Sequence, residues 1–350
     1  MLTRFIDKFI PRVAFVIMLC MMMAACSDSD DDAVGTEDVS VAFTLTVADA
    51  TSTRAENDGW DDYSPAQDGI LNENLVNTDD IIIAIYDDKG NKVDNVEDLR
   101  VTTVSDPSIT GATMYAITGV WRNAKPNVDK AKRVMVIANS NVSAWSDPSA
   151  LTYDLNTGTR KYIPMWGVVK IPATLTLGKQ NKLPNIQMLR AMAKVSVNLR
   201  TDMAEYGYSI GSMTVNNYNT KGYCVPKTFN EVDNTSEVRF ANSLNVLDSH
   251  ADKIALPTTA PLYLPEYDNS GTNPTTITVN LNRNGTLEGT YTLYFRNYDS
   301  DGKPTGPTYP IQRNHYYQYL IYKETGKIIV TLHVRKWNRR IYPENDGIIM

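Results

Sequence analysis

The clearest pattern in the chain is an alternation of apolar and polar residues between positions 39 and 47. The apolar members are Val39, Val41, Phe43, Leu45 and Val47, and they are separated by Ser40, Ala42, Thr44 and Thr46. A period of two over nine residues predicts a β-strand with one apolar face. Loss of such a strand would leave an open sheet edge beside an apolar trough.

Short apolar runs of the same kind continue along the chain, and turn residues such as Asp88-Lys89-Gly90-Asn91 separate them. With few helical periods between them, these runs predict an all-β fold of two tandem β-sandwich domains with short helices in the connections. The domain boundary is expected near Pro184, which gives an N-terminal domain at 55–186 and a C-terminal domain at 187–350. The expected strands lie at 81–86, 99–104, 114–120, 134–138, 173–177, 195–199, 212–218, 254–264, 276–281, 290–295, 316–322 and 327–337.

The first 25 residues have the pattern of an export signal. Arg4, Lys8 and Arg12 precede an apolar stretch at 13–25 that is too short to be a comfortable membrane span. The sequence Met23-Ala24-Ala25-Cys26 at its end resembles the lipobox of bacterial lipoproteins, which predicts lipid attachment at Cys26. The acidic run 28–32 that follows resembles a surface-export signal and predicts a hydrated tether. The segment 26–54 is therefore expected to hold the tether and the first strand.

The segment that follows the first strand is small and polar. It runs from Asp49 to Gly59 and has Arg54 as its single basic residue, followed by Ala55. Such a segment predicts an exposed loop of the kind that proteases cut.

Composition and charge exclude several classes of function. A formal net charge of -6 leaves no basic field for nucleic acid. The three His and three Cys are scattered, which argues against a metal centre or a Cys-His catalytic pair. The G-x-S-x-G letters at 207–211 are followed by strand-type residues rather than by a helix, which disfavours a nucleophile elbow. Cys224 is expected to be a buried small hydrophobe. Neither an enzyme activity nor a cofactor is therefore expected.

Taken together, the lipobox, the first strand with Arg54 behind it and three short motifs resemble the fimbrillin or Mfa-like subunits of Bacteroidales fimbriae, the type V pili. The motifs are Ile163-Pro164-Met165-Trp166-Gly167, Arg190-Ala191-Met192-Ala193-Lys194-Val195 and Pro310-Ile311-Gln312-Arg313-Asn314-His315-Tyr316-Tyr317. The resemblance implies two transthyretin-like domains. It also implies export to the outer membrane as a lipoprotein, trimming after Arg54 by an arginine-specific surface protease, and polymerisation with other fimbrial subunits at the cell surface by donor-strand exchange.

A donated strand needs alternating apolar residues. The expected strand at 327–337 offers them near the C-terminus, and the tail 343–350 is the other candidate. Two alternatives stay open for the whole protein, namely a monomeric surface lipoprotein that binds glycan or another ligand, and a fimbrial anchor subunit that is never cut. The inward residues of the candidate donor strand are Ile328, Val330, Leu332 and Val334.

Overall fold

The computed structural model describes residues 36–47, 67–68, 73–105, 113–141, 150–155, 162–226, 230–231, 238–239, 250–256 and 261–338. Within these residues the regular structure is nearly all β-strand, and the helical pieces are a 3-10 turn at Val128–Lys130 and α2 at Asp202–Glu205. The all-β prediction with short helices in the connections is confirmed. No helix in these ranges is long and apolar enough to cross a lipid bilayer.

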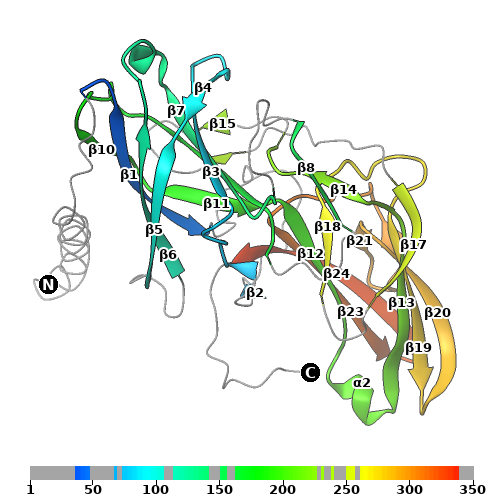
Figure 1. Cartoon of the computed structure of the whole chain (residues 1–350). Helices are drawn as coiled ribbons and strands as arrows, with labels where there is room; N and C mark the ends of the chain where they lie inside the picture. Colours follow the sequence, from blue (N-terminus) through cyan, green and yellow to red (C-terminus); the bar gives the residue numbers. More distant parts are fainter. Residues whose placement is uncertain are drawn as a thin grey trace, which may run out of the picture.

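The N-terminal part of the described chain forms one nine-stranded sheet, and most of its strands are labelled in Figure 1. The strand order is β4-β3-β7-β9-β11-β1-β6-β5, and β10 also pairs with β1. The first strand of the chain therefore lies inside the sheet. The bounds are β1 (Val39–Val47), β3 (Ile81–Tyr86), β4 (Lys92–Asn95), β5 (Glu97–Ser105), β6 (Thr113–Trp121), β7 (Arg133–Ala138), β9 (Met165–Lys170), β10 (Gln180–Lys182) and β11 (Ile186–Arg190).

Strands β3, β7 and β9 are buried on both faces, which explains why their sequences are continuous apolar runs. Ile83, Ile85 and Val136 face the core that contains the apolar side chains of β1. Their neighbours Ala84 and Ile137 face a second apolar cluster, which lies toward the C-terminal domain. The sheet therefore supplies one face to its own core and part of the other to the domain joint.

The C-terminal domain is a sandwich of a five-stranded and a four-stranded sheet. Alternate residues of both sheets share one core, in which Phe295 stacks edge-on against Tyr317 and Tyr319. The first sheet has the order β18-β12-β23-β24-β2 and the second β17-β13-β19-β20. The bounds are β2 (Gln67–Asp68), β12 (Met192–Leu199), β13 (Tyr208–Asn219), β17 (His250–Leu256), β18 (Leu262–Pro265), β19 (Thr276–Arg283), β20 (Thr286–Tyr294), β23 (His315–Glu324) and β24 (Lys327–Asn338).

The two domains are joined by short pairings as well as by the chain itself. Strand β8 (Thr152–Asp154) pairs with β14 (Lys221–Tyr223) across the joint. The remaining two-stranded ribbons are β15 (Asn230–Glu231) with β16 (Val238–Arg239), and β21 (Asn297–Tyr298) with β22 (Pro304–Thr305).

Strand pairing changes from one domain to the other at Ala191. β11 belongs to the N-terminal sheet and β12 to the C-terminal one. The boundary expected from the sequence, 186/187, falls at the start of β11, a few residues before this change. The expected strand at 173–177 is wrong, because this segment is a connection that leads into β10. The Asn181 side chain bonds both the N–H and the carbonyl of Thr176 there and takes the place of a sheet partner.

Candidate functional site

β1 occupies a slot between two other parts of its sheet. It pairs antiparallel with β6 from Val39 to Thr46. On its other side it pairs in parallel with β10 from Ser40 to Ala42 and with β11 from Leu45 to Val47. Its loss would therefore leave two facing strand edges rather than the single open edge expected from the sequence.

The inward face of β1 is central to the N-terminal core, as its alternation predicts. The five apolar side chains are 0–2% exposed and pack on residues of β3, β6, β7, β9 and β11. At roughly 1.5 to 3 kcal/mol for each large apolar side chain buried, this face makes a large contribution to the stability of the domain. These residues are Val39, Val41, Phe43, Leu45 and Val47.

The second face of β1 is polar but is also buried. Ser40, Thr44 and Thr46 are each less than 10% exposed. The Thr44 hydroxyl donates to Oδ1 of Asn185 over 2.8 Å, and Nδ2 of Asn185 donates to the Thr46 hydroxyl over 2.9 Å. Both faces of the strand therefore make specific contacts.

The entry to β1 is held by charge. Asp38 accepts hydrogen bonds from the Arg122 guanidinium over 2.8 Å and from the backbone N–H of Asn123 over 2.9 Å. The Asp98 and Asp38 carboxylates together raise the pKa of Arg122, so the guanidinium stays charged. These contacts fix where the strand enters the sheet.

The candidate donor strand β24 is built into the C-terminal domain. It pairs antiparallel with β23 along most of its length, from Lys327 to Lys336. Val330, Leu332 and Val334 are buried in the C-terminal core, and Ile328 packs at its margin. Donation of β24 to another subunit would therefore require these contacts to open.

Several residues singled out in the sequence lie outside the described ranges. These are the lipid attachment residue Cys26, the processing residues Arg54 and Ala55, and the tail 343–350. Their roles stay predictions.

All three family-like motifs meet at the domain joint, and Arg190 links two of them there. Arg190 has no exposed surface, and its guanidinium donates to Oδ1 of Asn314 over 2.7 Å and to the carbonyl of Glu73 over 3.0 Å. It also donates to the side chain of Asn74. Arg190 thus links the segment at 73–74 to the end of the N-terminal sheet and to the residue before β23.

Glu73 is the buried anion of this joint. Its carboxylate lies 2.8 Å from Nζ of Lys194 and accepts a hydrogen bond of 2.6 Å from the Tyr263 hydroxyl. Burial and the Glu73 charge raise the pKa of Tyr263, so this hydroxyl stays protonated and can donate. Removal of one member of such a buried set leaves an uncompensated charge, which costs about 3 to 5 kcal/mol.

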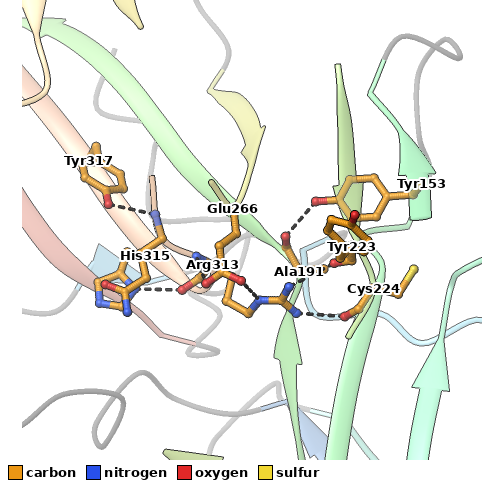
Figure 2. Close-up of polar contacts among 9 residues, drawn as sticks. Tyr153, Ala191, Tyr223, Cys224, Glu266, Arg313, His315 and Tyr317 are labelled. Carbon is orange, nitrogen blue, oxygen red and sulfur yellow. Dashed lines mark hydrogen bonds and ion pairs between the residues drawn. The ribbon is translucent and has the colours of Figure 1, made fainter. Parts of the chain in front are cut away.

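A second buried ion pair lies nearby, and Figure 2 shows its contacts. Nε of Arg313 lies 2.6 Å from the Glu266 carboxylate, and both side chains are buried. The same guanidinium donates to the backbone carbonyls of Cys224 and Tyr223. Cys224 itself is fully buried in the apolar cluster of the joint, as expected from the sequence.

The sequence did not identify Glu73 or Glu266. Arg190, Lys194 and Arg313 belong to the motifs seen in the sequence. Their charge among apolar neighbours is the one sequence signal that buried carboxylates must exist. Which of the 40 acidic residues supply them depends on the tertiary fold.

The G-x-S-x-G letters at 207–211 do not form a nucleophile elbow. Ser209 of the G-x-S-x-G letters lies within β13 and pairs with Asn282 of β19, so it does not stand on the strand-to-helix turn that an elbow needs. In the part of the chain that the structure describes, no group of three or more His, Cys, Asp or Glu could hold a metal ion.

Comparison with known proteins gives a match at the level of structure. No family model and no curated protein sequence matches the chain. The tip fimbrial protein Mfa3 from Porphyromonas gingivalis, solved with a C-terminal truncation, matches with a TM-score of 0.50 and 15% identity, over 86% of this chain and 100% of that one. The chain has the fold of this fimbrial protein. A fimbrial assembly protein from Parabacteroides distasonis aligns with a TM-score of 0.47 and 15% identity, over 84% of this chain and 94% of that one. The match to the fold of Mfa3 confirms, at the level of fold, the resemblance seen in the sequence.

Proposed function

We propose that the chain is a structural subunit of a surface fimbria that polymerises by strand exchange at the β1 slot. The observation that carries the proposal is the position of β1. The strand that directly precedes Arg54 in the chain is seated inside the N-terminal sheet, with both of its edges paired and both of its faces buried. The Mfa3-like fold supports the same assignment.

Maturation follows the order of the segments. The chain is exported by residues 1–25, receives lipid at Cys26 and reaches the surface of the outer membrane on its acidic tether. An arginine-specific surface protease cuts after Arg54 and releases the tether together with β1. The membrane anchor and the strand are therefore lost in one step.

The empty slot then accepts a strand from another subunit. Two unpaired strand edges beside an apolar trough are a template for an extended segment. An incoming strand with apolar residues at every second position restores the ladder and the core together. Fibre growth is thus coupled to the repair of the N-terminal domain.

The donor is an extended segment of the next subunit, and β24 and the tail 343–350 are its two sources within this sequence. β24 has the required alternation, but its inward face already fills the C-terminal core. The tail carries apolar residues only at Ile348, Ile349 and Met350.

The decisive experiment is N-terminal sequencing of the surface form of the parent and of Arg54→Ala, each expressed in cells as the full-length chain. The parent should begin at Ala55 and assemble, whereas Arg54→Ala should keep β1 and stay unpolymerised. Arg100→Ala, in the exposed strand β5, is the matched control and should behave as the parent. Arg54→Ala should incorporate labelled palmitate, and the added substitution Cys26→Ser should abolish the labelling. This measurement tests lipid attachment at Cys26. A monomeric binding lipoprotein or an uncut anchor is the correct assignment if the parent also retains β1.

A further inference from the structure

One side chain outside β1 forms hydrogen bonds with two successive residues on the polar face of β1. Thr44 and Thr46 are two residues apart and lie on the same side of the strand. The amide of Asn185 spans them, with Oδ1 as acceptor for Thr44 and Nδ2 as donor to Thr46, over 2.8 and 2.9 Å. Both ends of one amide are therefore matched to two hydroxyls at alternate positions.

Asn185 belongs to the wall of the slot and not to the strand that fills it. It lies in the connection between β10 and β11, the two strands that pair in parallel with β1. In the same stretch, the N–H of Leu183 donates to the carbonyl of Ala42, and Nδ2 of Asn181 donates to the carbonyl of Ser40. When β1 leaves, this wall remains and the Asn185 amide loses both hydroxyls.

We infer that Asn185 determines the register of whichever strand occupies the slot, and that it selects an extended segment with a hydrogen-bond donor at one outward position and an acceptor at the next outward position. The inference rests on the strand exchange proposed above. A shift by one residue would turn apolar side chains toward the amide and polar ones toward the core. A shift by two would leave one end of the partly buried Asn185 amide without a partner.

The selection distinguishes the two candidate donors. When Val330–Val334 is aligned with Phe43–Val47, Thr331 takes the place of Thr44 and His333 that of Thr46. Thr331 can donate to Oδ1, and an unprotonated ring nitrogen of His333 can accept from Nδ2. The tail 343–350 has no donor followed two residues later by an acceptor, because Glu344 and Asp346 are both acceptors and Asn345 is followed by Gly347. A segment with the β24 pattern therefore suits the amide, and the tail does not.

The contact is tested first in the intact chain, by urea unfolding of the N-terminal domain. Thr44→Val with Thr46→Val, and Asn185→Ala alone, should each lower the midpoint. The triple variant should unfold at about the same urea concentration as Asn185→Ala, because the same two hydrogen bonds are lost in each case. Thr331→Val combined with Asn185→Ala is the control, and its effects should add. Additive losses in the Thr44, Thr46 and Asn185 set would overturn the inference.

Recognition of an incoming strand is tested on the full chain after treatment with an arginine-specific protease. Labelled peptides of residues 38–47, the same peptide with Val at both Thr positions, residues 327–337 and residues 340–350 compete for the slot. The Thr peptide should bind about tenfold more tightly than the Val peptide, and Asn185→Ala should abolish this difference. The 327–337 peptide should bind more tightly than the 340–350 peptide. Equal capture of the Thr and Val peptides overturns register selection alone, whereas capture of no peptide overturns strand exchange and the selection with it.

Discussion

β1 and β24 share a pattern of alternating apolar and polar residues but have different positions in their sheets. Each alternates apolar residues with polar ones, and each points the apolar set into the core of its own domain. β1 is flanked by β6 on one side and by β10 and β11 on the other, whereas β24 has β23 along its length and only the two-residue β2 on its other edge. The alternation therefore predicts the inward face of a strand but not how many neighbours the strand has.

The difference bears on which strand can leave and what remains behind. Loss of β1 would divide the N-terminal sheet, because β6 and β11 are joined through it. Loss of β24 would remove a strand close to one edge of its sheet and leave β12, β18 and β23 paired. Filling a vacant β1 slot would therefore restore more strand pairing than filling a vacant β24 position, which agrees with the proposed role of the slot as the acceptor.

The largest effects are expected from Asp on the inward faces. Leu45→Asp should destabilise the N-terminal domain, and Leu332→Asp the C-terminal domain, each by about 3 kcal/mol or more, because an unpaired carboxylate is buried. Amide hydrogen exchange should show loss of protection in β7 for the first variant and in β19 for the second. If β19 remains fully protected in Leu332→Asp, the inward face of β24 is not part of that core.

Much of this architecture could be predicted from the sequence, because alternation and apolar runs are local signals. The expected strand at 81–86 matches β3 residue for residue, and that at 327–337 falls one residue short of β24. The burial of Thr44 and Thr46 could not be predicted, because Asn185 lies about 140 residues away in the chain. Without knowledge of Asn185, the polar side chains of Thr44 and Thr46 indicate a solvent-exposed face.

The domain joint shows the same limit for charged residues. The motif at 190–195 was recognised in the sequence, yet the role of Arg190 depends on Glu73 and Asn314, which are 117 and 124 residues distant. In the same motif Lys194 pairs with the Glu73 carboxylate, and such a buried cation indicates that an anion is near without identifying which acidic residue supplies it.

Glu73→Ala is expected to destabilise each domain core less than the Asp substitutions do. It should weaken the coupling between the two domains more. It removes the anion that faces Lys194 and Tyr263, at a cost of about 3 to 5 kcal/mol shared by the two domains. Calorimetry should show one cooperative transition in the parent and two in the variant. Asp301→Ala, which breaks the exposed pair with Lys327 at the start of β24, is the control and should change the profile little. A single transition at the parent temperature in Glu73→Ala would mean that the joint does not couple the domains.

The smallest effects are expected on the outward faces, and they test directly whether the two strands differ. Thr44→Asp puts a carboxylate into a buried position where Oδ1 of Asn185 is an acceptor, so two acceptors would face each other. Thr331→Asp puts the same group on a half-buried face of β24, where water can still reach it. The first substitution should lower the free energy of unfolding by about 2 kcal/mol and the second by less than about 1 kcal/mol, as measured by urea denaturation. Equal losses would show that the outward face of β1 is no more enclosed than that of β24, and the case for a slot that recognises both faces of its strand would fail.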